Sequence, residues 1–431
     1  MQIERTEYSD TSEPESIGHP PSSSDSAASR GVAVVPRRRY YAVLAPLIVL
    51  LILWVWLFDG EGAFKSGPSG KSLGSDWAMF VGAAQVMKVG GDPYNPGVLY
   101  RTEAAMMHHQ HLSMIKNSQR AQVRVGNPPL LYWAMRPLTD RSFNPSTVIA
   151  LIALYVLSAV GFIACLRYFG WRARVVPTFI FLLMPQVVLG AYYGNVVGIV
   201  FAAVGLSLLL TRRYPLLAGA LLSFAWLKPP VALPVVLLVG LFYVSSKLRF
   251  ALGFSAATAI LFVLTLATTG WHSVELWAHG LLRYSNEMSI QPDVISLSGL
   301  YVRWMPSTPR VVLELLTVVA ALAVTAYFVQ KQRGDREDAL SIAPLWIVWM
   351  LAAPYGHFFD EIILAVPLLA YLGSNGYRVV YRLPAVALYL AFFSLFFISW
   401  TPFRVYLLPL MLLGILACML RSRDDSRFAI P

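Results

Sequence analysis

The chain has 431 residues, of which 57% are hydrophobic and only 13% are charged, and its net charge is +11. A soluble domain carries about 25% charged residues, so this composition excludes an ordinary soluble protein and indicates a polytopic membrane protein. In such a protein an excess of Arg and Lys is typical of cytoplasmic loops, so we expect no nucleic-acid partner. The two cysteines, Cys165 and Cys418, fall inside apolar segments and predict no disulfide framework.

The ends of the chain differ from the apolar body between them. Residues 1–36 are rich in Ser, Pro and Glu and poor in large apolar side chains, which predicts a disordered tail. The first apolar run begins near Tyr41, too far along the chain for a cleaved signal peptide. We therefore expect a cytoplasmic tail at 1–36, a transmembrane domain at 37–423 and a short cytoplasmic tail at 424–431.

The body is a succession of apolar segments. A spanning helix needs roughly 20 apolar residues, and this rule predicts an all-α membrane protein with about 12 transmembrane helices. The segments lie at 40–58, 145–167, 174–190, 195–211, 214–227, 230–246, 250–270, 309–330, 339–353, 361–373, 383–399 and 404–420. The segment at 214–227 is ended by Lys228-Pro229-Pro230, so it is either a full span or a broken, re-entrant helix.

Basic residues recur in alternate connections between these segments. Because Arg and Lys collect in cytoplasmic loops, we place both ends of the chain on the cytoplasmic side of the cytoplasmic (inner) membrane. The inner groups are Arg37, Arg38 and Arg39; Arg167, Arg172 and Arg174; Arg212 and Arg213; Lys247 and Arg249; Lys331, Arg333 and Arg336; Arg378 and Arg382; and Arg421 and Arg423. Short outer connections, such as AYYGN at 191–195 and PYGHFFDE at 354–361, lack Lys and Arg.

Two outer connections, at 59–144 and 271–308, are long enough to carry a function of their own. The first predicts a helix that begins at Ser75 and ends at Gly90-Gly91. Its apolar residues, at helical spacing, are Trp77, Phe80, Val81, Ala84 and Met87. A second helical stretch covers 97–116. We expect both helices to be amphipathic and to lie in the membrane interface.

The unusual polar residues all fall on the outer side of this topology. Charged residues near membrane depth are costly and tend to mark functional sites. The candidates are Asp76 in GSDWAMF, Tyr193 and Asn195 in YYGN, Lys228 in LKPP, Arg283 in the loop at 279–299, and His357 and Asp360 in PYGHFFDE. The sequence therefore predicts one outward-facing cavity lined by an acid, a Lys, a His and an Arg.

The order of these elements resembles the polyprenyl-linked sugar transferases of glycosyltransferase family 87, in the GT-C superfamily. The resemblance extends over about 40–420 and rests on GSDWAMFVGAAQVMKVGGDPYNP, PPLLYWAMRPL, YYGNVVGIVFAAVGLSLLL, LLAGALLSFAWLKPPVALPVVLL and the His of PYGHFFDEIILAVPLL. It implies a GT-C-type fold whose active site faces the outside, or the periplasm.

The resemblance also implies a reaction. A hexose, with mannose as the first expectation, would pass from a polyprenyl phosphate carrier to a glycolipid or glycan acceptor, with inversion. Asp76 matches the acidic position of the family and would act as the general base. Lys228, Arg283 and His357 would hold the phosphate, while Asn195, Tyr193 and Asp360 are assigned to substrate binding. No cofactor is expected.

Simpler interpretations stay open at each candidate position. Asp76 can merely cap its helix, Lys228 can anchor a helix end at the interface, and His357 can be a satisfied helix-end histidine. Asp360 can cap the following span, and Arg283 can be a solvated loop charge.

Two other functions and a metal site have less support in the sequence. A transporter or flippase often shows internal repeats, and none is evident in the sequence. A glycan polymerase or ligase would use a diphosphate-linked donor, for which the outer loop offers only Arg283 and Arg303. The histidines His108, His109 and His111 lack the spacing of a zinc motif, so no metal is expected.

Overall fold

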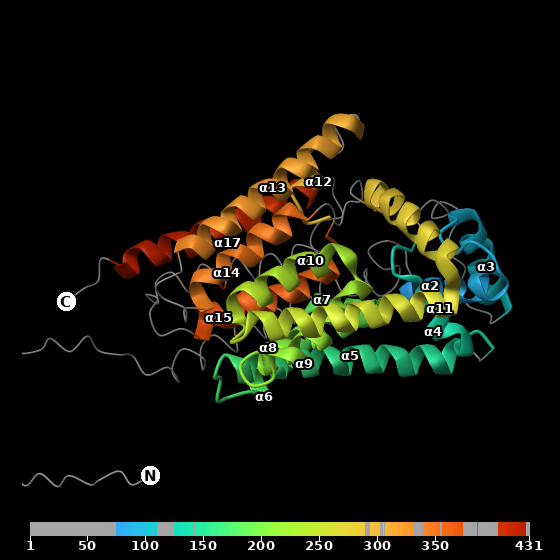
Figure 1. Ribbon diagram of the computed structural model, residues 1–431, viewed down its shortest axis with the longest axis horizontal. Helices are drawn as coiled ribbons and strands as arrows, with labels where there is room; N and C mark the ends of the chain where they lie inside the picture. Colours follow the sequence, from blue (N-terminus) through green and yellow to red (C-terminus); the bar gives the residue numbers. More distant parts are fainter. Residues whose placement is uncertain are drawn as a thin grey trace, which may run out of the picture. The chain divides into compact units, whose positions relative to one another are not determined.

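The computed structural model describes residues 75–109, 125–140, 143–288, 294–301, 305, 307–331, 339–353, 356–373, 386 and 404–427 (Figure 1). The elements are α2 (Ser75–Lys88), α3 (Pro96–His109), α4 (Pro129–Met135), η2 (Arg136–Leu138), α5 (Phe143–Tyr168), α6 (Val175–Leu182), α7 (Pro185–Tyr193), α8 (Val197–Leu210), α9 (Pro215–Leu222), η3 (Ser223–Leu227), α10 (Pro229–Leu238), η4 (Val239–Tyr243), α11 (Lys247–Met288), α12 (Ser298–Tyr301), α13 (Ser307–Lys331), α14 (Ala339–Ala352), η5 (Phe358–Leu364), α15 (Ala365–Gly373) and α17 (Arg404–Arg427). The predicted tail at 1–36, the span at 40–58 and nearly all of the span at 383–399 lie outside the described residues.

Within the described residues, three helices are long and apolar enough to cross a membrane. They are Ser146–Tyr168 in α5, Lys247–Leu281 in α11 and Pro309–Gln330 in α13. A fourth span results if α6 and α7, which are bent by 56° at the break between them, are counted together. The all-α membrane architecture is thus confirmed, whereas the predicted count of about 12 spans is not.

The remaining apolar segments of the described chain form helices that are too short to span. These are Val197–Leu210, Pro215–Leu227, Pro229–Tyr243, Ile342–Ala352 and Pro409–Arg421. Prolines mark several of the breaks, because Pro suits the first turn of a helix but cannot continue the helix before it. With 14 residues, α8 rises about 21 Å, which is less than the roughly 30 Å hydrocarbon core. Hydropathy identifies these apolar segments but not their interruptions.

Glycines bring pairs of helices into close contact. The helix α5 packs along α8, and α9 packs along α11. A Cβ atom on Gly205 would overlap the backbone of Gly161, and one on Gly219 or Gly253 would overlap the backbone of the facing helix. Small residues that let backbones approach are typical of helix packing in membranes. The surrounding apolar core includes Phe181, Phe201 and Trp346.

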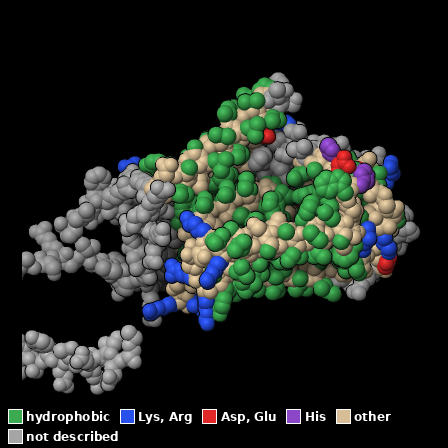
Figure 2. Space-filling view, in the orientation of Figure 1, with side chains coloured by type: hydrophobic (Ala, Val, Ile, Leu, Met, Phe, Trp, Pro, Cys, Tyr) green, Lys and Arg blue, Asp and Glu red, His purple; other side chains and the backbone are tan. Residues whose placement is uncertain are grey.

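The long helices α11 and α13 present apolar side chains to the surroundings. Only 17% of the apolar window of each is buried, and Figure 2 shows a broad hydrophobic surface over both helices. The exposed side chains include Leu252, Ile260 and Val263 of α11, and Leu315, Leu316 and Val319 of α13. An exposed apolar surface of this kind suits contact with lipid.

Three of the basic connections lie together at the C-terminal end of α8. The hydroxyl of Ser245 donates hydrogen bonds to the carbonyl oxygens of Thr211 and Arg212, at 3.1 and 3.0 Å. The Arg212 guanidinium lies over the Tyr168 ring, 5.9 Å from its centroid. The exposed basic side chains here are Arg167, Arg172, Arg174, Arg212, Arg213, Lys247 and Arg249. Figure 2 shows Lys and Arg gathered at the lower left of the view.

The predicted helix after the first apolar run is confirmed, but its amphipathic character is not. The helix α2 begins at Ser75 and ends at Lys88, just before Gly90, whose φ is +77°. Apart from Gln85 and Lys88, its described side chains are buried. It packs with α3, α4 and part of α11 in an apolar cluster that includes Phe80, Tyr132 and Trp277. Neighbouring elements cover the face that the sequence pattern assigned to water.

Candidate active site

Asp76 lies in the first turn of α2 and is nearly inaccessible, with 4% of its surface exposed. Its Oδ2 atom accepts a hydrogen bond of 3.0 Å from the Nδ2 atom of Asn195. Acidic residues favour the first turn of a helix because of the helix dipole. The position therefore agrees with a capping role, and the contact with Asn195 adds a partner from a distant part of the chain.

Asn195 lies in the short turn between α7 and α8, and the residue before it has to be glycine. Gly194 has φ +80°, and a Cβ atom there would come within 2.6 Å of the Trp77 Cβ atom and 3.1 Å of its backbone nitrogen. Only glycine adopts this conformation readily and leaves room for Trp77. The α7–α8 turn therefore packs directly on the first turn of α2, which carries Asp76.

The side-chain oxygen of Asn195 accepts hydrogen bonds from two donors. Its Oδ1 atom accepts hydrogen bonds from the backbone nitrogen of Val197, at 3.0 Å, and from the Nζ atom of Lys228, at 3.3 Å. Asn195 and Lys228 are 9% and 8% exposed, respectively. One amide thus contacts both the predicted base and the predicted phosphate-binding cation.

Lys228 stands at the break between η3 and α10. Proline at the next position disfavours helical geometry for the residue before it, and Lys228 accordingly has φ −136° and ψ 83°. Its carbonyl accepts the first backbone hydrogen bonds of α10, from Val231 and Ala232. The Asn127 amide donates to the carbonyl of Leu227, at 2.6 Å, and ties this break to the NPP segment.

Asp360 pairs with Lys228 and also orders the start of η5. Its Oδ1 atom lies 2.5 Å from the Lys228 Nζ atom, and it is completely buried. Its Oδ2 atom accepts a hydrogen bond of 2.9 Å from the backbone nitrogen of His357. Asp360 therefore caps η5, as the simpler interpretation expected, and it neutralises a buried cation as well.

His357 lies beside this pair at the N-terminal end of η5, with 7% of its surface exposed. It forms an isolated β-bridge with Val294, and the adjacent Gly356 carbonyl accepts a hydrogen bond of 2.9 Å from Ile295. The segment at 294–297 is thereby fixed against the start of η5. Through its backbone nitrogen, His357 is joined to the same Asp360 carboxylate that pairs with Lys228.

The predicted residues Asp76, Asn195, Lys228 and Asp360 thus form one buried polar chain, which we call the acid–amide–lysine chain. Each of its members lies at a helix start or a helix break. The chain holds two carboxylates and one ammonium in surroundings where charges interact strongly. A carboxylate in such a chain can accept a proton, and an ammonium can stabilise an anionic leaving group.

Tyr193 and Arg283, two of the predicted site residues, are not members of the acid–amide–lysine chain. The ring of Tyr193 is 1% exposed and packs edge-on against Tyr192, with centroids 5.4 Å apart, among the apolar core. Arg283 belongs to α11, which bends at Gly270, and its side chain lies outside the described residues. Near α3, Asp92 accepts a hydrogen bond of 2.8 Å from the backbone nitrogen of Tyr94 and so orders the turn after α2.

Sequence reasoning missed a second buried pair behind this chain. The Nε2 atom of Gln186 donates a hydrogen bond of 3.0 Å to the Oε2 atom of Glu361, and both residues are at most 1% exposed. Gln186 falls inside the segment at 174–190 that was predicted to be a plain span. A lone amide in an apolar run was the available signal, because polar groups at membrane depth need partners.

A tyrosine braces the segment that approaches Lys228. The hydroxyl of Tyr94 donates a hydrogen bond of 3.0 Å to the carbonyl of Asn127. Burial raises the pKa of the Tyr94 phenol well above its ordinary value, and the neighbouring Tyr132 and Asp92 raise it further. Tyr94 therefore remains a neutral donor at physiological pH. No cluster of three or more metal-ligating side chains occurs among the described residues.

A family model for glycosyltransferase family 87 matches residues 126–354. The chain belongs to glycosyltransferase family 87. It is therefore a membrane glycosyltransferase, an enzyme with a sugar donor and an acceptor as substrates. Searches of curated proteins and of solved structures gave no significant match.

The matched range contains only part of the acid–amide–lysine chain. Asn195 and Lys228 lie within it, whereas Asp76 precedes it and Asp360 follows it. The hydrogen bond to Asp76 and the ion pair with Asp360 join these outlying residues to the family-matched part of the protein.

Proposed function

We propose that this enzyme transfers a hexose, with mannose as the first candidate, from a polyprenyl phosphate carrier to a hydroxyl group of a glycolipid or glycan. The reaction takes place at the outer face of the cytoplasmic membrane and inverts the anomeric configuration. The proposal adds three things to the family assignment: the class of donor, the stereochemistry of the transfer, and the side of the membrane on which it takes place.

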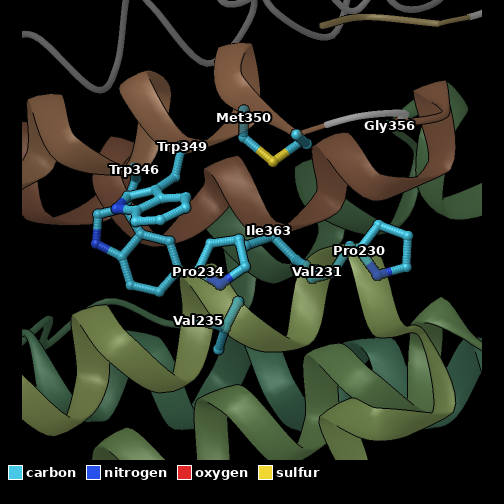
Figure 3. Close-up of a pocket in the computed structure, with 10 residues that line it drawn as sticks. Pro230, Val231, Pro234, Val235, Trp346, Trp349, Met350, Gly356 and Ile363 are labelled. Atoms are coloured by element: carbon cyan, nitrogen blue, oxygen red, sulfur yellow. The ribbon is translucent and has the colours of Figure 1, made fainter. Parts of the chain in front are cut away.

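The observation that carries the donor proposal is an apolar pocket beside the acid–amide–lysine chain. The pocket lies between α10 and α14 (Figure 3). At one end are Pro230, two residues after Lys228, and Gly356, the residue before His357. All of its lining residues are apolar, namely Pro230, Val231, Pro234, Val235, Trp346, Trp349, Met350, Ala353, Gly356 and Ile363. The cavity itself has room for about one water molecule, so the support comes from the chemistry of its lining. A lipid-linked sugar joins an apolar chain to an anionic phosphate, and an apolar lining near the Lys228 ammonium suits these two parts.

The roles of the side chains follow from their chemistry. Asp76 accepts the proton of the acceptor hydroxyl, whose oxygen attacks the anomeric carbon while the bond from that carbon to the phosphate oxygen breaks. The phosphate leaves as an anion and needs no strong proton donor, so a single carboxylate suffices. Lys228 and His357, together with Arg283, hold the phosphate as its charge develops. Asp360 orients Lys228.

The sidedness proposal is supported by the two ends of α8. Asn195 precedes this helix, and the exposed basic residues Arg212 and Arg213 follow it. The helix separates them by about 21 Å, given its 14 residues. If the basic connections face the cytoplasm, the acid–amide–lysine chain is directed toward the outer face.

The decisive experiment measures sugar transfer by the purified enzyme from radiolabelled polyprenyl phosphate mannose to an extract of envelope lipids. Asp76→Asn is expected to reduce the rate by about 10²- to 10⁴-fold while the protein remains folded, because the general base is lost. Asp140→Asn is the matched control, since Asp140 is an exposed carboxylate that pairs with Lys88 at 2.6 Å.

Three outcomes would contradict parts of the proposal. Full activity of Asp76→Asn would show that another group is the base. Transfer only from a different polyprenyl phosphate sugar would replace mannose, and transfer only from a diphosphate-linked donor would replace the donor class. The anomeric configuration of the product, determined by NMR, tests inversion directly.

A further inference from the structure

The amide of Asn195 lies between the proposed base and the proposed phosphate-binding cation. We propose that Asn195 is a positioning residue that orients Asp76, and that it links Asp76 to the Lys228–Asp360 ion pair. This inference rests on the proposed function and replaces the earlier assignment of Asn195 to substrate binding.

The orientation of the amide is determined by its neighbours. The backbone N–H of Val197 and the ammonium of Lys228 are both donors, so both require the carbonyl oxygen Oδ1 of Asn195. The NH₂ group must then face Asp76, where Nδ2 donates to Oδ2 at 3.0 Å. In a flipped amide, the NH₂ group of Asn195 would face the two donors, Val197 and Lys228, and both hydrogen bonds would be lost.

This orientation has a chemical consequence for Asp76. A hydrogen bond donated to a carboxylate favours its charged form and limits its rotation. The contact of Lys228 with Oδ1 polarises the same amide and strengthens its N–H donor, because hydrogen bonds in a chain reinforce one another. The charge of Lys228 thereby acts on Asp76 through the side chain of Asn195.

The position of the amide is set by the backbone around it. Gly194 packs on Trp77, the residue after Asp76, with the close approach described above. The bond from Val197 restrains the same side chain at the start of α8. Asn195 therefore reaches Asp76 from a restrained turn, as a positioning residue requires.

Two substitutions separate this role from a purely structural one. Asn195→Ala removes every side-chain bond. Asn195→Asp has nearly the same shape and keeps an acceptor for Val197 and Lys228, but it faces Asp76 with an oxygen in place of the NH₂ group. If Asn195 only stabilises its turn, the aspartate variant should be the more active of the two.

The proposed role predicts the opposite order. At neutral pH, Asn195→Ala should lower kcat by about tenfold to a hundredfold with a smaller change in donor KM, because the base is misplaced by a fraction of an ångström. Asn195→Asp should be less active still, since two facing carboxylates retain a proton. Its activity should recover as the pH rises, with the acid limb of the kcat profile displaced upward by at least about one pH unit.

A second measurement needs no donor. The C=O stretch of protonated Asp76 can be identified by infrared spectroscopy as the band that Asp76→Asn removes, and then titrated. In Asn195→Ala this band should persist to higher pH than in wild type. For Asn195→Asp, the double variant D76N/N195D serves as the reference. Melting temperatures establish that each variant is folded.

The outcomes are distinguishable from those of the proposed function. An unchanged titration of the band in Asn195→Ala, or an aspartate variant at least as active as the alanine variant with an unmoved acid limb, overturns the inference. If wild type transfers nothing from polyprenyl phosphate mannose but the titration moves as expected, the donor assignment fails and the link between Asn195 and Asp76 stands.

Discussion

The long helices and the broken helices of this enzyme differ in what they contribute. The helix α13 and the span within α11 expose apolar side chains over most of their surface. The short elements α7, α8, η3, α10 and η5 begin or end at the residues of the acid–amide–lysine chain. In a membrane, irregular backbone is tolerated only where protein or a cavity surrounds it. The polypeptide thus brings the polar groups of its candidate site to the helix breaks and keeps them buried.

The largest effect is expected at the helix break that carries Lys228. Lys228→Met leaves the buried Asp360 carboxylate without its cation and should lower the free energy of unfolding by about 3–5 kcal/mol. The matched control is Lys88→Met, because Lys88 pairs with Asp140 at the surface, with side-chain exposures of 39% and 71%. It should change stability by less than about 1 kcal/mol. Thermal unfolding in detergent measures the stability of both variants.

A double variant sharpens this result. Lys228→Met combined with Asp360→Asn removes both charges, so most of the lost stability should return while sugar transfer stays absent. If Lys228→Met alone is as stable as Lys88→Met, the buried ion pair does not exist in solution and the break is held by other contacts.

The next effect is expected at the glycine turn. Gly194→Ala meets both an unfavourable backbone conformation and Trp77, whereas Gly170 has φ +71° and no atom within 4 Å of an added Cβ. Gly170→Ala should cost about 1–2 kcal/mol for the backbone alone. Gly194→Ala should cost about 1–3 kcal/mol more, from overpacking.

Activity gives a second readout for the same pair. Because the turn at Gly194 carries Asn195, Gly194→Ala should also reduce sugar transfer, while Gly170→Ala should leave the rate per folded molecule unchanged. Equal stability and equal rates for the two variants would contradict the close approach of this turn to α2.

The smallest effect is expected on the exposed face of α13. Leu316 is 55% exposed, so Leu316→Ala should change the free energy of unfolding by less than about 0.5 kcal/mol and leave transfer unchanged. Leu208 of α8 is completely buried, and Leu208→Ala should cost about 2–5 kcal/mol. A large effect at Leu316 would indicate that protein, rather than lipid, covers this face.

Much of the candidate site could be predicted because its residues are conspicuous in an apolar sequence. Asp76, Asn195, Lys228, His357 and Asp360 were expected on one side, and the structure brings them close together. A topology drawn from Arg and Lys alone was sufficient for this grouping. Their catalytic and binding roles stay predictions, and the side chain of Arg283 lies outside the described residues.

The number and shape of the helices were less accessible to sequence reasoning. Hydropathy averages over a window, so it does not register a break such as that between α6 and α7 at Pro185. The spacing of Trp77 and Phe80 predicts one apolar face of α2, but it contains no information on what packs against the opposite face. The Gln186–Glu361 pair was missed because Gln186 is a single amide in an apolar run, whereas Glu361 belongs to the distant outer connection at 354–361.

The adjacent carboxylates of η5 have a consequence for how a donor is received. Asp360 binds Lys228 at the start of α10, while Glu361 binds Gln186 of α7. A displacement of η5 toward either partner therefore stretches the bond to the other. The start of η5 is thereby restrained by two contacts. Under the proposed function, a phosphate that recruits Lys228 would have to detach the lysine from the Asp360 carboxylate, and part of the binding energy of the donor would be used in separating that pair.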